Sequence, residues 1–228
     1  MSETLNSMAF SSPRDSDIAL LIVDMINDFE FEGGKKLFKN TCSIVEGVRD
    51  LKFRARRANV PVIYVNDGLN RWSEDRDMFL ETVLAGSAKA KEVVSEIRPM
   101  AGDYMIIKPQ RSGFYGTSLG SLLLSLNVGR LIITGIATDI CVLFTAHDAH
   151  MRGYSVSVPS DCAAAEADQF HRQALQLMER VAKIETAASD GISFGEPALP
   201  SVEVELAATI RSDRFVTRRH LVDKLPVY

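Results

Sequence analysis

The sequence has few cysteines, no long apolar segment and no excess of positive charge. Its three cysteines are an odd number without Cys-x-x-Cys spacing, which predicts free thiols in a reducing compartment rather than a disulfide framework. The net charge of -4 argues against nucleic acid as the main partner, because phosphate binding needs clustered Lys and Arg. The apolar run at residues 18–23 is too short to span a bilayer. We therefore expect a protein that acts on neither nucleic acid nor membrane.

The first 17 residues are polar and lack the apolar stretch of a secretory signal, which predicts a cytoplasmic location. A chain of 228 residues with 46% hydrophobic residues is typical of one globular α/β domain. We predict a flexible extension at residues 1–16, the domain at 17–190 and a C-terminal extension at 191–228. That extension contains a helical patch at 202–211, which either packs on a partner subunit or is loosely held.

Short β-branched apolar runs alternate with longer segments of helical periodicity, a pattern typical of a parallel sheet with helices on both faces. We predict strands at 18–23, 62–65, 104–107, 131–134 and 155–158, with a weaker sixth near 184–187. We predict helices at 41–58, 88–97, 118–126, 141–151 and 167–181. Residues 68–87 read as a long loop with a helical turn, a kind of segment that often forms a lid. The fold class is a three-layer (α/β/α), mostly parallel, Rossmann-like sheet of about six strands.

Polar residues follow nearly every predicted strand. In open α/β sheets ligands bind beyond the carboxyl ends of the strands, so these positions are the place to look for a site. The residues are Asp24, Asn66, Asp67, Lys108, Thr134 with the following loop to Cys141, and Asp161.

Cys141 begins a helical run directly after a strand and a short turn. A thiol at a helix N-terminus faces unpaired N–H groups, which favour the thiolate and can hold an oxyanion. Asp24 could take its proton and Lys108 could stabilise its charged form. The alternatives are a buried structural cysteine, an aspartate that caps or turns the chain, and a lysine that is simply solvated.

Three segments together resemble motifs of the isochorismatase-like cysteine hydrolases. Residues 19–29 read ALLIVDMINDF, residues 107–109 read IKP with SGF at 112–114 and Thr117, and residues 135–142 read GIATDICV. Thr145-Ala146 and Gly153-Tyr154 continue the pattern, and the resemblance covers roughly residues 17–187.

The resemblance implies a Cys141 nucleophile, an Asp24 general base and acid, and Lys108 as the stabilising cation. It also implies a cis peptide between Ile136 and Ala137, with the backbone N–H groups of Ala137 and Cys141 forming an oxyanion hole. It further implies a homo-oligomer, either a dimer or a tetramer, and no cofactor.

Several further residues lie in segments that flank the expected pocket, where an aromatic wall would suit a small planar ligand. Ordinary packing is the alternative for each aromatic residue. Asp67 either orients a loop or touches substrate, Asp161 suits a turn, and Cys42 and Cys162 are interpreted as structural. The predicted substrate-binding residues are Phe29, Asn66, Asp67, Trp72, Phe114, Tyr115 and Ile136.

A metal site is not expected. Nicotinamidases of the family hold zinc through an Asp-x-His arrangement after the second strand, whereas residues 66–70 read NDGLN here and all four histidines lie beyond Cys141. His147 and His150 are one helical turn apart, but two ligands do not make a site. Nicotinamidase activity is therefore not predicted.

The preferred function is hydrolysis of a C–N bond in a small amide or ureido (carbamoyl) substrate through a thioester on cysteine. One alternative is a vinyl ether hydrolase of the isochorismatase type, and another is a catalytically silent binding protein of the same fold. A dinucleotide-binding role is weaker, because no G-x-G-x-x-G motif follows the first strand. The substrate itself is not identified by the sequence.

Overall fold

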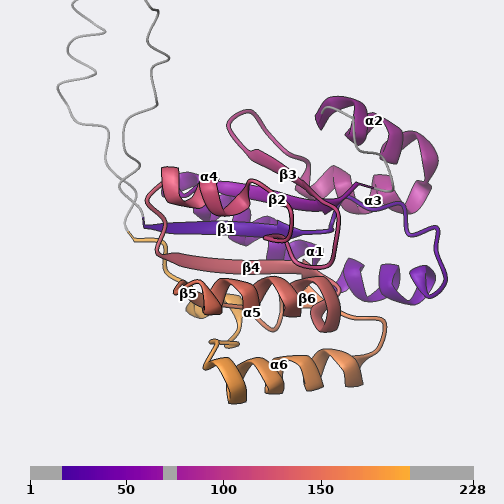
Figure 1. Cartoon of the computed structure of the whole chain (residues 1–228). Coiled ribbons are helices and arrows are strands. Elements are labelled where there is room, and N and C mark those ends of the chain that lie inside the picture. Colours follow the sequence, from indigo (N-terminus) through magenta and orange to yellow (C-terminus); the bar gives the residue numbers. More distant parts are fainter. Residues whose placement is uncertain (1–16, 69–75, 196–228) are drawn as a thin grey trace, which may run out of the picture. The chain divides into compact units, whose positions relative to one another are not determined.

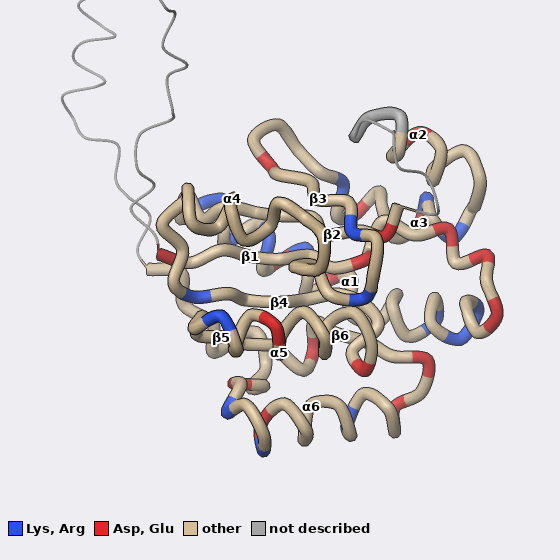
Figure 2. Tube along the Cα trace, viewed as in Figure 1, with Lys and Arg blue, Asp and Glu red and all other residues tan. Residues whose placement is uncertain are grey.

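The computed structural model describes residues 17–68 and 76–195, with side chains described from residue 79 onward in the second range. The predicted N-terminal extension, the helical patch at 202–211 and Trp72 lie outside these ranges. The predicted domain boundaries remain predictions. In the part of the chain that is described, no helix is both long and apolar enough to cross a membrane. Basic and acidic residues are interspersed along the described trace (Figure 2).

The core of the fold is a six-stranded sheet in which every pairing is parallel, as the sequence predicted (Figure 1). The strand order is β3-β2-β1-β4-β5, and β6 pairs with β4 off this path. The strands are β1 (Ile18–Val23), β2 (Val62–Asp67), β3 (Tyr104–Lys108), β4 (Arg130–Ile136), β5 (Ser155–Ser157) and β6 (Ala163–Ala164).

The sixth strand is not where the sequence analysis placed it. Residues 184–187 form only an isolated bridge between Glu185 and Ser157, whereas β6 pairs with the end of β4. Two alanines carry no β-branched signal, so this short strand could not be recognised from periodicity.

Helices cover both faces of the sheet, which gives the predicted three layers (Figure 1). Alternate β1 residues point to opposite faces, since Leu20 and Ile22 pack with α1, α2 and α3 while Leu21 packs with α4, α5 and α6. The helices are α1 (Gly34–Arg57), α2 (Arg76–Gly86), α3 (Ala88–Ile97), α4 (Leu119–Ser125), the π-helix η1 (Thr138–Val142), α5 (Leu143–Met151), α6 (Asp168–Ala182) and the short 3-10 helix η2 (Ser189–Gly191).

Helices α1 and α2 depart from the prediction. Helix α1 begins at Gly34, earlier than the predicted residue 41, and α2 occupies much of the segment predicted as a loop. Phe79, Leu80 and Val83 of α2 are buried in the core beside the sheet. Tertiary packing of this apolar face stabilises a helix that its weak local periodicity did not reveal.

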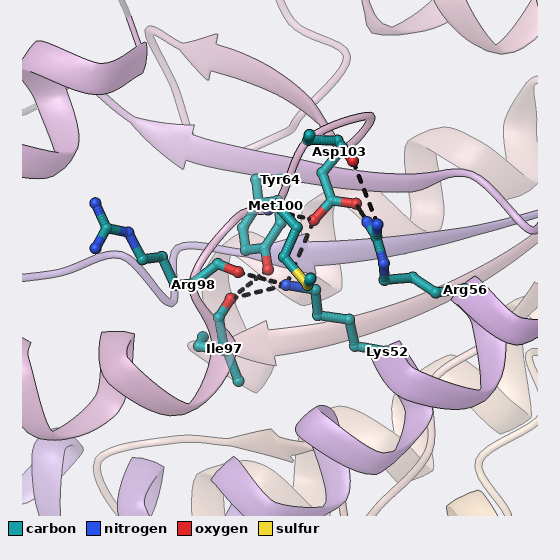
Figure 3. A network of polar contacts seen from close by, with 8 residues as sticks. Lys52, Arg56, Tyr64, Ile97, Arg98, Met100 and Asp103 are labelled. Carbon is teal, nitrogen blue, oxygen red and sulfur yellow. Dashed lines mark hydrogen bonds and ion pairs between the residues drawn. The ribbon is translucent and has the colours of Figure 1, made fainter. Parts of the chain in front are cut away.

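A buried polar network joins four elements on one side of the sheet (Figure 3). The Lys52 ammonium, from α1, donates to the Ile97 carbonyl at 3.4 Å and pairs with Asp103 at 3.4 Å. Arg56 also pairs with Asp103, and the Tyr64 hydroxyl donates to the Ile97 carbonyl. The network therefore fixes α1 and β2 against the end of α3 and the start of β3.

We predict that Asp103→Ala lowers the free energy of unfolding by about 3 to 5 kcal/mol, because the Lys52 ammonium stays buried without its counter-charge. Urea denaturation measures the change. Glu96→Ala is the control, since it removes a surface pair with Arg49 in which the side chains are 44% and 49% exposed. This control should lower the free energy of unfolding by less than about 1 kcal/mol. Equal losses of unfolding free energy in the two variants would contradict the proposed contribution of the network to stability.

Candidate active site

Three side chains from distant parts of the chain meet at the carboxyl edge of the sheet. Asp24 directly follows β1, Lys108 is the last residue of β3, and Cys141 lies in the turn after β4. The Lys108 Nζ atom is 2.9 Å from Asp24 Oδ2 and 3.4 Å from Cys141 Sγ. The Cys141 thiol and the Asp24 carboxylate also shift each other's pKa. A carboxylate, an ammonium and a thiol thus form one cluster.

The end of β1 orients the carboxylate. Asp24 has a φ of 52°, a conformation that aspartate tolerates better than most residues. Its Oδ1 accepts a hydrogen bond of 2.7 Å from the backbone N–H of Asp67, which ends the neighbouring strand β2. One carboxylate oxygen is therefore held by the backbone and the other by Lys108.

The sequence analysis predicted that Cys141 begins an α-helix. In the structure Cys141 instead lies in the π-helix η1, which precedes α5. The Ala137 carbonyl accepts from the N–H groups of Ile140 and Val142, on either side of Cys141. The second of these bonds spans five residues, which widens the turn. The peptide bond between Ile136 and Ala137 is cis, as the resemblance predicts.

Burial controls the charges of the cluster. The Lys108 and Asp24 side chains are only 1% and 8% exposed. Burial raises the Asp24 pKa, and the Lys108 charge offsets part of this. Burial lowers the Lys108 pKa, but the negative charges of Asp24 and Cys141 outweigh it and leave the pKa above its usual value.

The thiol keeps its proton in this arrangement. Burial, followed by the negative charge of Asp24, raises the Cys141 pKa to about 12. The sequence analysis expected the helix terminus to favour the thiolate, and in the resting cluster burial and Asp24 oppose that effect. Loss of the proton to water would place two negative charges beside one ammonium. Transfer of the proton to Asp24 leaves the total charge unchanged, so the cluster favours internal transfer.

Contacts between the loop after β3 and helix α5 fix Lys108 beside the cysteine turn. The Gly113 N–H donates to the Thr145 hydroxyl at 2.9 Å, and the Ser112 hydroxyl donates to the Asp148 carboxylate. A Cβ atom at Gly113 would lie 2.8 Å from Val65 Cγ1, so the close approach requires glycine. The sequence analysis noted several of these residues in motifs but did not identify this supporting role.

The predicted aromatic wall is largely core packing. Phe29 is buried and meets Phe38 edge-on, with ring centroids 5.3 Å apart. Phe114 is buried and stacks on Tyr154 at 6.0 Å. Tyr115, in contrast, is 63% exposed. The alternative of ordinary packing thus describes the first two rings.

The remaining predicted contacts surround the end of β2 and β4. The buried Asn66 donates through Nδ2 to the Ile26 carbonyl, and its Oδ1 has no hydrogen-bond partner among the residues that the structure describes. The Asp67 side chain is exposed, while its N–H holds Asp24. Ile136 is buried in the core.

Other titratable residues from the sequence analysis lie away from the cluster. Asp161 accepts hydrogen bonds from the Ser189 N–H at 2.8 Å and its hydroxyl at 2.7 Å. His147 contacts the Leu143 carbonyl of its own helix. Among residues 17–68 and 76–195, no three His, Cys, Asp or Glu side chains are grouped to hold a metal ion.

A parallel α/β sheet with a carboxylate, an ammonium and a thiol joined at its carboxyl edge defines a cysteine hydrolase of the α/β class. The family model described as "Isochorismatase domain" matches residues 18–189. The chain belongs to the isochorismatase family and is a hydrolase of that family.

Three similar proteins illustrate the relationship. An uncharacterized isochorismatase family protein, YaaI of Bacillus subtilis, is 44% identical over 177 residues, which cover 78% of this chain and 97% of that protein. The ureidoacrylate amidohydrolase RutB of Serratia proteamaculans is 30% identical and covers 69% of this chain and 74% of its own. The crystal structure of N-carbamoylsarcosine amidase from Thermoplasma acidophilum has a TM-score of 0.59 and 32% identity, covering 77% of this chain and 98% of that chain.

We predict that Asp24→Asn speeds alkylation of Cys141 by iodoacetamide at neutral pH. The substitution removes a negative charge that raises the thiol pKa, keeps Lys108, and retains an oxygen for the Asp67 N–H. Mass spectrometry at Cys141 measures the rate. Cys162 is the internal control, because burial and its own neighbour Asp161 raise its pKa to about 12. An unchanged or slower rate at Cys141 would show that the Asp24 charge does not control the thiol.

Proposed function

We propose that this protein hydrolyses a C–N bond of a small amide or ureido (carbamoyl) substrate through a thioester on Cys141. The contact of Lys108 with both Asp24 and Cys141 is the observation that carries the proposal. The names of the relatives support amidohydrolase activity in general, and two of them specify a ureido or a carbamoyl compound. A cytoplasmic location and a homo-oligomer remain predictions.

The first half of the reaction forms the thioester. Asp24 accepts the Cys141 proton, and the sulfur attacks the substrate carbonyl carbon while Lys108 stabilises the negative sulfur. The carbonyl electron pair moves to oxygen, where the backbone N–H groups of Ala137 and Cys141 donate to it. Asp24 then gives its proton to the leaving nitrogen as the C–N bond breaks.

The second half releases the product. A water molecule gives a proton to Asp24 and attacks the thioester carbonyl carbon. The C–S bond breaks, the carboxylic or carbamic acid leaves, and the proton returns from Asp24 to the sulfur. Asp24 thus alternates between base and acid, which suits a carboxyl group whose pKa is raised by burial.

We predict that Cys141→Ala lowers turnover by at least about a thousandfold, because the nucleophile is lost. Ammonia release from a panel of small amides, carbamoyl compounds and ureido acids identifies the substrate and measures the loss. Circular dichroism checks that the fold is intact, and Cys42→Ser is the matched control that should remain active. Full activity in the alanine variant would exclude the covalent mechanism. A vinyl ether hydrolase should instead release no ammonia from any of these compounds.

We also predict the acid limb of the pH profile. The base must be ionised, and burial raises the Asp24 pKa, so kcat/KM should fall as the pH drops through a value above the ordinary aspartate pKa. That limb should therefore lie above about pH 4. Initial rates across the acid range measure it. A limb at the ordinary aspartate value would contradict the role of a buried Asp24 as base.

A further inference from the structure

A histidine on α6 contacts the turn that carries the cysteine. Thr138 is the first residue of η1 and is fully buried. Its Oγ1 lies 2.9 Å from Nδ1 of His171, in the first turn of α6. The backbone of Ser160, between β5 and β6, also lies near this ring and raises the His171 pKa. One imidazole therefore bridges the cysteine turn and a loop that precedes β6.

The two neighbours of the ring indicate its tautomer. A backbone group that raises the ring pKa acts as an acceptor, so we assign the ring N–H of the neutral imidazole to the Ser160 side and Nδ1 as the acceptor that faces Thr138. Thr138 can then donate its hydroxyl proton to Nδ1. The strand β6 that follows this loop pairs with Gly135 and Ile136, immediately before the cis peptide. The imidazole thus joins the cysteine turn to the loop that leads into β6, the strand that pairs with the end of β4.

We propose that neutral His171 is a positioning residue that holds the Cys141 turn through Thr138. The proposal rests on the proposed function of Cys141 as nucleophile. His171 acts on the sulfur only through the turn, so it should affect kcat more than KM. The sequence analysis missed it because Thr138 and His171 are 33 residues apart and only the tertiary fold brings them together.

Protonation of the ring should weaken this bond. Once Nδ1 carries a proton it donates to Thr138, whose own hydroxyl proton must then find another partner in a buried position. His171 also lines a surface cavity with Ser160, Asp161 and Asp168, through which a proton can reach the ring. The ring and the turn are therefore coupled to solvent pH.

The charged groups near the His171 ring set the pH at which the ring is protonated. Burial lowers the His171 pKa, the carboxylates of Asp168 and Asp139 oppose this effect, and Arg172 adds to it. The net pKa lies below the ordinary histidine value, so the ring is neutral at neutral pH. The positioning bond is present above that pKa and is lost as the pH falls through it.

The first test compares two replacements of the histidine. His171→Leu fills the space without an acceptor and should lower kcat about tenfold with little change in KM. His171→Asn offers a carbonyl oxygen near the Nδ1 position and should restore most of kcat. The asparagine variant should also lose the histidine step in the acid pH profile and keep the Asp24 step. Equal losses in both variants would overturn the proposal.

A double-mutant cycle tests the bond itself. Thr138→Val removes the hydroxyl and keeps the side-chain shape, so it should lower kcat as much as His171→Leu does. The double variant should have a kcat no lower than that of either single variant. Additive losses would overturn the proposal. His150→Leu, an exposed position on α5, is the matched control and should leave kcat unchanged.

Iodoacetamide labelling of Cys141 separates this proposal from the proposed function, since it needs no substrate. A changed labelling rate in His171→Leu, restored in His171→Asn, supports positioning even if no amide is hydrolysed by the wild-type protein. In that event the proposed function alone fails. Wild-type turnover and labelling in both His171→Leu and Thr138→Val would overturn the positioning role and leave the proposed function intact.

Discussion

The site depends on one buried ammonium that faces two groups able to be negative. Lys108 contacts both Asp24 and Cys141, and in a buried cluster an uncompensated charge is costly. The cluster therefore accommodates one negative partner at a time. When a proton moves from the Cys141 sulfur to the Asp24 carboxylate, Lys108 has one negative partner before the transfer and one after it. This constraint explains how a thiol that is protonated at rest could serve as the nucleophile that we propose.

Contacts from several elements of the fold hold this cluster in position. The order β3-β2-β1-β4 places the ends of β1, β3 and β4 along one edge, and the backbone N–H of Asp67, at the end of β2, donates to the Asp24 carboxylate after β1. The Gly113–Thr145 bond joins the lysine loop to α5, while His171 reaches the cysteine turn from α6. On the opposite face the Lys52 network fixes α1 and α3 against the sheet. Each charge is thus held by rigid neighbouring elements.

The fold class and most strands followed from the sequence, because buried parallel strands such as Ile18–Val23 are nearly continuous apolar runs. Elements with weak local signals did not. Helix α2 forms because Phe79 and Leu80 reach the core, and β6 forms because Ala163 and Ala164 lie beside the end of β4. The π-helix at Cys141 depends on a backbone bond to Ala137 that no side-chain pattern encodes.

The sequence by itself determined the family and pointed to the three chemical groups of the candidate site, because its motifs place Asp24, Lys108 and Cys141 after predicted strands. Only the tertiary structure decided their protonation. A pKa depends on burial and on distances of a few ångströms between charges, and these arise when segments far apart in the chain pack together. For the same physical reason, the contact between Thr138 and His171 could be found only in the folded chain.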